Sequence, residues 1–240
     1  MNNNLTEIVF ILDRSGSMAG LEADTVGGFN AMVERQKKEE GTALLSAVLF
    51  SNDSEVLYDR TDIRRIEPMT DAQYRVGGCT ALLDAIGDAV HHIRNVHKYA
   101  REEDRPAKTV FVITTDGMEN ASRRYTYEAV QKAVGEAREK LGWEFLFLGA
   151  NMDAIAAARR FGISEKRAVR YECDSAGTAL NFNVVSKTIG NFRSGEPISD
   201  DWCEAIEEDY AERGREQPPV LHVRKDNSRP KGTIYSEGNS

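Results

Sequence analysis

Strand-length apolar runs alternate with segments of helical period along most of this chain of 240 residues. Alternation of this kind is typical of a parallel sheet that is covered by helices on both faces. We therefore predict an α/β, doubly wound (Rossmann-like) fold. The expected strands are residues 8–12, 44–50, 55–58, 108–115, 143–148 and 168–171.

The strand expected at residues 55–58 follows the preceding strand after only a few polar residues. That connection is too short for a helical crossover, so we expect an antiparallel pair at the edge of a mostly parallel, six-stranded sheet. Apolar positions at helical spacing place the helices between the strands. They are expected around residues 26–33, 82–93, 125–141, 152–161 and 179–192.

With 40% apolar residues, the chain has enough apolar material for the core of one ordinary domain. The periodic pattern ends near Arg213, and three of the 6 prolines lie beyond that point. Segments with few apolar residues and several prolines rarely add to a core. We therefore predict a domain over residues 1–212 and a flexible tail over residues 213–240.

The formal net charge of −8 argues against a nucleic-acid partner, because phosphate backbones require a basic face. The N-terminus lacks the basic start of a signal peptide, and no apolar stretch approaches the roughly 20 residues of a membrane span. The three cysteines, Cys79, Cys173 and Cys203, have no CxxC spacing that would indicate a disulfide framework or a zinc site. We expect a cytoplasmic protein.

Oxygen-bearing side chains follow two of the predicted strands. Asp13, Ser15 and Ser17 come directly after the first strand, while Asp116 ends the strand at 108–115 and is followed by Gly117. In a doubly wound sheet, neighbouring strands whose connections leave in opposite directions open a crevice at their carboxyl ends. If these two strands are such neighbours, two carboxylates and two hydroxyls converge there.

Two carboxylates in a small volume repel each other unless a cation lies between them. Hydroxyl and carboxylate oxygens without His or Cys suit a hard ion. Mg²⁺ is therefore the first choice, Mn²⁺ or Ca²⁺ is possible, and zinc is the poor choice.

The pattern Asp13-x-Ser15-x-Ser17, with Thr80 after a glycine-containing loop and Asp116 at a strand end, resembles the complete metal-ion-dependent adhesion site (MIDAS) of the von Willebrand factor A (vWA) family. The order of elements agrees with that family from about residue 5 to the helix near residue 192. We interpret the chain as an intracellular vWA protein of the bacterial type. The resemblance implies that the two serines bind the metal directly, Thr80 directly or through water, and both aspartates largely through waters.

A metal held mostly by neutral hydroxyls keeps much of its positive charge and attracts an anionic ligand from outside. The resemblance therefore implies a metal-dependent protein-binding module, not an enzyme, whose partner presents an Asp or Glu carboxylate. Loop residues near the site either touch that partner or are ordinary polar loop residues. They are Glu119, Asn120, Arg123, Arg124 and Asn151.

Two other functions stay open at this point. A Mg²⁺-dependent phosphatase or phosphotransferase of the haloacid dehalogenase type also uses a strand-ending Asp, but Ser15 stands where its acid–base carboxylate is needed. The metal could also be only a structural brace of a scaffold subunit.

Plainer interpretations exist for several single residues. Asp13 to Ser17 could be a turn that caps a helix, and Thr80 could be the N-cap of its own helix. His91 and His92 do not have zinc-ligand spacing to His97, which favours a solvated or packed helix face. For Cys79, a small buried residue is more common than a reactive thiol.

Overall fold

The computed structural model describes residues 1–216 and contains a six-stranded sheet with the strand order β3-β2-β1-β4-β5-β6. All neighbouring strands pair in parallel except β3, which pairs antiparallel with β2 at the sheet edge. The predicted fold class is confirmed. The strands are β1 (Asn2–Asp13), β2 (Thr42–Phe50), β3 (Ser54–Asp62), β4 (Pro106–Thr115), β5 (Glu144–Gly149) and β6 (Ala168–Arg170).

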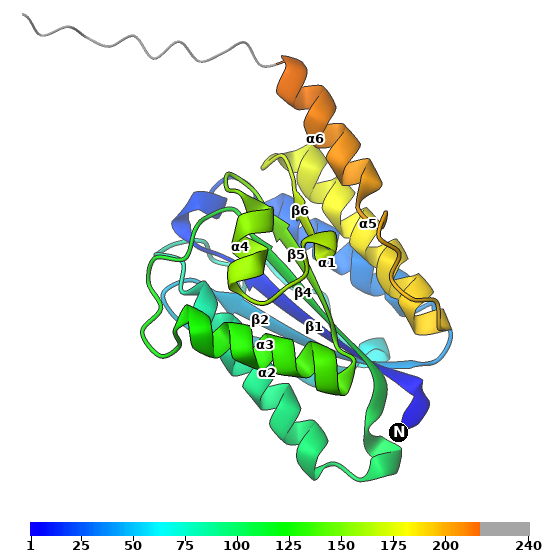
Figure 1. The fold of residues 1–240 in the computed structure, drawn as a ribbon. Helices are drawn as coiled ribbons and strands as arrows, with labels where there is room; N and C mark the ends of the chain where they lie inside the picture. Colours follow the sequence, from blue (N-terminus) through cyan, green and yellow to red (C-terminus); the bar gives the residue numbers. More distant parts are fainter. Residues whose placement is uncertain (217–240) are drawn as a thin grey trace, which may run out of the picture.

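Helices cover both faces of this sheet (Figure 1). One face packs against α1, α5 and α6, and the other against α2, α3 and α4. The helices are α1 (Glu22–Gln36), α2 (Leu82–Tyr99), α3 (Tyr127–Leu141), α4 (Ala154–Arg160), α5 (Ser175–Ser194) and α6 (Glu204–Glu216). No helix of residues 1–216 combines the length and apolarity that crossing a bilayer requires.

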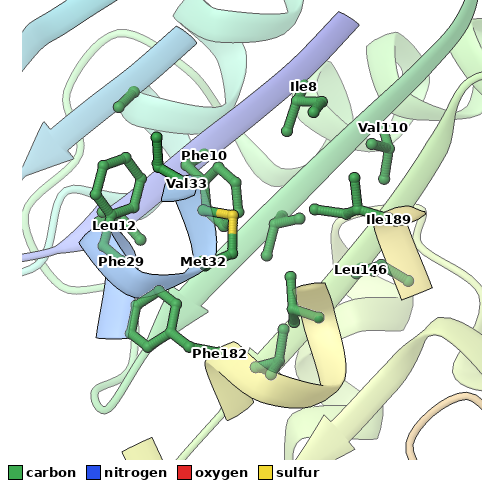
Figure 2. Close-up of a cluster of buried hydrophobic side chains, with 14 of the residues drawn as sticks. Ile8, Phe10, Leu12, Phe29, Met32, Val33, Val110, Leu146, Phe182 and Ile189 are labelled. Atoms are coloured by element: carbon green, nitrogen blue, oxygen red, sulfur yellow. The ribbon is translucent and has the colours of Figure 1, made fainter. Parts of the chain in front are cut away.

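The central strand β1 is buried on both faces, which explains why its sequence is apolar at consecutive positions. Phe10 packs edge-on against Phe29 of α1, and Phe182 of α5 lies in the same apolar layer (Figure 2). Val9 and Ile11 point to the opposite layer, below α2 and α3. Burying a large aliphatic or aromatic side chain stabilises the fold by roughly 1.5–3 kcal/mol, so these two layers fix β1 in the middle of the sheet.

The connections around β1 leave in opposite directions. The chain passes from β1 through α1 to β2 on one side, whereas α2 brings it back to β4 on the other side. Leu12 pairs with Leu49 of β2 and with Thr114 of β4, so the carboxyl ends of the three strands lie level. The expected crevice therefore lies between β1 and β4, at the edge where Asp13 and Asp116 are found.

Helix α6 was not predicted from the sequence. Its only regularly spaced apolar side chains are Ile206 and Tyr210, and the helix is otherwise rich in Glu. Ile206 is buried against the α1–α5 face, and Arg213 pairs with Asp174 at the N-cap of α5. The boundary predicted at residue 213 thus lies inside a helix, and the rest of the expected tail, residues 217–240, lies outside the described residues.

Candidate functional site

Asp13 ends β1 with its side chain almost completely buried and held at both oxygens. Oδ1 accepts a hydrogen bond of 2.7 Å from the backbone N–H of Ser15, and Oδ2 accepts one of 2.6 Å from the Thr115 hydroxyl. The Tyr74 hydroxyl donates to the Asp13 carbonyl oxygen. These contacts give the carboxylate one orientation, toward the loop that follows the strand.

That loop brings two serine hydroxyls in front of β4. The Ser15 and Ser17 hydroxyl oxygens lie 3.1 Å apart, and the Ser17 hydroxyl donates a hydrogen bond of 2.6 Å to Asp116 Oδ1. A backbone bond of 3.0 Å from Gly16 to the Gly78 carbonyl ties the loop to the segment that precedes Thr80. Ser15 is buried but Ser17 is exposed, so the cluster opens to solvent at Ser17.

Thr80 borders the same space. A β-carbon added to Gly117 would lie 3.4 Å from both the Ser17 and the Thr80 hydroxyl oxygens, which places both hydroxyls close to that glycine. Asn120 holds Thr80 through two bonds: its Oδ1 accepts from the Thr80 N–H at 2.8 Å, and its N–H donates to the Thr80 carbonyl at 3.0 Å. The alternative interpretation of Thr80 as the N-cap of its helix does not hold, because α2 begins at Leu82 with Ala81 as its N-cap.

Both acidic residues of this cluster are almost fully buried: Asp13 is 1% exposed and Asp116 is 2% exposed. Burial raises the pKa of both, and the negative charge of Asp116 further raises the pKa of Asp13. Within residues 1–216 neither carboxylate forms an ion pair with Lys, Arg or His. A bound cation would offset the cost of holding both in the charged form.

The donor atoms fit a hard cation. Three of the five side chains are hydroxyls and two are carboxylates, which are the oxygen ligands that Mg²⁺, Mn²⁺ and Ca²⁺ accept. Nowhere in the described chain, this cluster included, do three side chains of His, Cys, Asp or Glu gather as a cation site, so a metal here would depend on the hydroxyl oxygens. Asp13, Ser15, Ser17, Thr80 and Asp116 are therefore the residues that could hold a metal.

Cys173 lies at the edge of this cluster, a position that was not predicted from the sequence. Its sulfur lies 3.9 Å from Asp116 Oδ2, and burial followed by the charge of Asp116 raises the pKa of the thiol to about 12. Cys173 follows the last strand of the sheet, so its position at a strand's carboxyl end was a usable signal. Strand β6 has only three residues, which made that signal weak.

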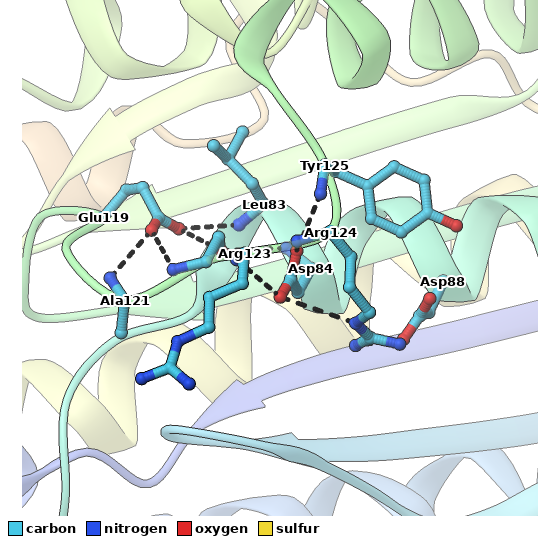
Figure 3. A network of polar contacts seen from close by, with 9 residues as sticks. Leu83, Asp84, Asp88, Glu119, Ala121, Arg123, Arg124 and Tyr125 are labelled. Carbon is cyan, nitrogen blue, oxygen red and sulfur yellow. Dashed lines mark hydrogen bonds and ion pairs between the residues drawn. The ribbon is translucent and has the colours of Figure 1, made fainter.

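Glu119 braces the loop after β4 to helix α2 (Figure 3). Its carboxylate accepts hydrogen bonds from the backbone N–H of Leu83 at 2.8 Å, of Ala121 at 3.0 Å and of Ser122 at 2.7 Å. A carboxylate that accepts hydrogen bonds from three part-buried backbone N–H groups stabilises the loop. Its expected part in partner binding receives no support from this geometry.

Asp84 supports the same loop from the first turn of α2. It accepts backbone bonds of 3.0 Å from Arg123 and of 2.9 Å from both Arg124 and Tyr125. The Arg124 side chain pairs with Asp84 at 3.5 Å and with Asp88 at 2.6 Å. The Arg123 guanidinium, by contrast, points away from these carboxylates (Figure 3).

Of the five residues expected around the partner, three thus have structural contacts: Asn120 at Thr80, Glu119 at α2 and Arg124 at Asp84. Arg123 and Asn151 are exposed, and Asn151 adopts a left-handed backbone conformation with φ of 52° directly after the loop residue Ala150. Partner binding by these two stays a prediction.

The remaining polar residues that the sequence singled out lie away from the cluster. His91 and His92 are on the surface, and His92 contacts Asp59 at 2.8 Å. His97 is buried and bonded to Glu7 at 3.1 Å, as expected for a packed helix face. Cys79 was expected to be buried but is exposed.

Comparison with known proteins places the chain in a family. The family model of the von Willebrand factor type A domain matches residues 7–182. No curated protein matches the chain.

Several solved structures share the fold. The vWF domain of the type V pilus tip protein Mfa5 from Porphyromonas gingivalis is 12% identical, with a TM-score of 0.57 over 81% of this chain and 98% of that chain. The pilus adhesin SpaC from Lactobacillus rhamnosus GG is 12% identical, with a TM-score of 0.59 over 78% of this chain and 30% of that chain.

Proximal thread matrix protein 1 from the mussel byssus is 16% identical, with a TM-score of 0.52 over 78% of this chain and 46% of its own chain. The present chain thus spans less than half the length of that protein. Another structure of the mussel protein has a zinc-occupied MIDAS motif. At these identities, the likeness shows a shared fold.

Proposed function

Because the chain belongs to the von Willebrand factor type A domain family, whose members are often metal-dependent protein-interaction modules, we propose that it binds a protein partner through a divalent metal ion. The metal, with Mg²⁺ as first choice and Mn²⁺ or Ca²⁺ as possible substitutes, would bind at the Ser15, Ser17 and Thr80 hydroxyls. Asp13 and Asp116 would support it. The observation that carries the proposal is the pair of buried carboxylates without an ion-pair partner in the described chain.

The ligand set explains why such a metal would recruit an acidic group. Neutral hydroxyls donate oxygen lone pairs but leave the charge of the ion largely unneutralised, so an external carboxylate gains more there than a neutral group. Ser17 is exposed at the mouth of the cluster, which gives an outside ligand access. An exposed mouth favours ligand binding over a metal that serves only as an internal brace.

The phosphatase alternative has less support. The position two residues after Asp13 holds Ser15, whose hydroxyl faces Ser17, where a haloacid dehalogenase-type enzyme needs an acid–base carboxylate. Proteins related to this domain are mostly adhesion or scaffold modules.

Metal binding is tested with Mn²⁺, because free Mn²⁺ can be counted directly by electron paramagnetic resonance. We expect wild-type protein to bind Mn²⁺ and Ser17→Ala to raise the Kd at least tenfold. Ser164→Ala is the matched control, since the Ser164 hydroxyl does not cap the short helix that follows it. Equal Mn²⁺ affinity in wild type and Ser17→Ala would reject the proposed metal site.

Recruitment of a carboxylate is tested separately with acetate. Mn²⁺ that is bound with an open coordination position should accelerate the ¹³C relaxation of the acetate carboxyl carbon, and excess Mg²⁺ should reverse the effect. If Mn²⁺ binds but acetate relaxes as in protein-free buffer, the outer position is closed and the brace function is favoured. Capture on immobilised protein in Mg²⁺ against EDTA then identifies the partner, and Thr80→Ala should reduce its retention.

A further inference from the structure

A groove lies at the opposite end of the sheet from the proposed metal site, between the last turns of α2 and α3 and the first residues of β4. In Figure 1 the label of the N-terminus marks this end of the molecule. The groove has a volume of about 560 Å³, within the range of small-molecule sites. Its lining includes four cationic side chains and an apolar part formed by Pro106, Leu141 and Trp143.

The four cations are Arg94, Lys98, Arg105 and Lys140, and no Asp or Glu of the described chain lines the groove with them. This lining is unusual in a chain of net charge −8. Glu136, outside the lining, receives Arg94 at 2.9 Å and Lys140 at 3.3 Å. Two further glutamates contact other lining residues: Glu7 is bonded to His97, and Glu102 lies 3.6 Å from the Met1 ammonium group. The Glu136 carboxylate orients two of the four cations, and its single negative charge does not neutralise all four.

The other two cations have no carboxylate partner among residues 1–216. Arg105 donates one bond of 3.3 Å to the Ala100 carbonyl, and its Nε is a buried donor without an acceptor. Lys98 lies four residues after Arg94 on α2, a spacing at which like charges destabilise a helix. An anion in the groove would offset the repulsion between Arg94 and Lys98.

From these contacts we infer that the groove binds a small phosphate-bearing anion with several negative charges. The guanidinium groups of Arg94 and Arg105 line the groove and are planar donors that phosphate oxygens accept, and the two lysines add charge that does not require one geometry. The surplus of positive charge suits an oligophosphate better than a singly charged carboxylate. His97 takes no part, because it is bonded to Glu7 inside the core.

Trp143 supplies the reporter for a binding test. It lines the groove, and Trp202, the second of the 2 tryptophans, is replaced by Phe so that the fluorescence comes from Trp143 alone. Inorganic tripolyphosphate is titrated into the full chain at low ionic strength. EDTA is present throughout, so that phosphate cannot bind through a metal at the Asp13 cluster. We expect a saturable fluorescence change that weakens as salt is raised.

Variants then locate the site. Lys98→Gln combined with Arg105→Gln should raise the Kd for tripolyphosphate at least tenfold, whereas Lys132→Gln on the exposed side of α3 should change it less than twofold. Circular dichroism confirms that each variant is folded, and Lys98→Gln alone is used if the double variant is not. No saturable change, equal affinity in Lys98→Gln and wild type, or binding of hexaglutamate in preference to tripolyphosphate would overturn the inference. The metal experiments are independent of all these outcomes.

Discussion

The Ser17 hydroxyl donates a hydrogen bond of 2.6 Å to Oδ1 of Asp116, which lies 99 positions later in the chain. This bond joins the loop after β1 to the end of β4 across the crevice between the two strands. A hydroxyl that donates its proton to a carboxylate keeps its lone pairs free for a cation. The contact therefore aligns an oxygen ligand and a negative charge on the same side of the cluster.

Removing one of the two buried carboxylates should distinguish the stabilisation that a bound metal provides from the stability of the metal-free fold. We expect Mg²⁺ to raise the melting temperature of wild type, with a gain of about 2.7 kcal/mol at a hundredfold excess over Kd. Asp116→Asn should lose this gain, while its stability in EDTA equals or exceeds that of wild type because one buried charge is gone. Thermal melts in EDTA and in Mg²⁺ measure both quantities. An identical Mg²⁺ shift in the two proteins would contradict the prediction.

Gly117→Ala tests the space between the hydroxyls. The new β-carbon would lie 3.4 Å from the Ser17 and Thr80 oxygens, where it crowds a metal that contacts both. Gly117 does not have a positive φ, so alanine can adopt its backbone conformation. We expect Mn²⁺ affinity to fall about tenfold, or about 1.4 kcal/mol, with little change in unfolding free energy. Gly135→Ala in α3, where the added carbon meets nothing within 4 Å, is the control and should leave the affinity unchanged.

Asp84→Asn should loosen the loop that Asp84 holds. Burial alone would raise the pKa of Asp84, but the backbone bonds from Arg123, Tyr125 and Arg124 outweigh it and lower the pKa below its ordinary value of 3.8. The charged form is therefore favoured in the folded state. Its stabilisation is present above pH 3.8 and is lost as the pH falls through the folded-state pKa.

Urea unfolding at pH 7 should accordingly show Asp84→Asn to be less stable than wild type by about 2 kcal/mol. The difference should shrink as the pH falls below 3.8 and through the lowered folded-state pKa of Asp84, because the wild-type carboxyl then becomes protonated as well. Asp88→Asn removes a partly exposed partner of Arg124 on the same helix and should cost at most about 1 kcal/mol. A pH-independent difference between Asp84→Asn and wild type would show that the charge is not responsible.

Two adjacent glycines of α1 test the contact between α1 and α5. A β-carbon on Gly28 would lie 2.3 Å from a ring carbon of Phe182, whereas one on Gly27 meets nothing within 4 Å. Gly28→Ala should destabilise the protein by about 1–2 kcal/mol, since overpacking exceeds the gain in helix propensity. Gly27→Ala should be neutral or stabilise it by up to about 1 kcal/mol. Equal unfolding free energies for the two variants would mean that the helices do not approach this closely.

Much of the fold could be predicted because the relevant signals are local. The consecutive apolar residues of β1, the helical spacing of Val26 and Phe29, and the short link before β3 each reflect a neighbourhood of a few residues. Helix α6 could not be predicted from such local signals. Its stabilising contacts, such as Arg213 with Asp174, join residues far apart in sequence.

The sequence by itself determined the alternation of strands and helices and the polar residues at the ends of β1 and β4, because backbone preference and periodicity act between near neighbours. Only the tertiary structure decided that β1 and β4 are adjacent and that Cys173 approaches Asp116. It also decided that Glu119 accepts a hydrogen bond from the backbone of α2. These outcomes depend on packing two apolar layers against one sheet, which brings together residues that no local pattern relates.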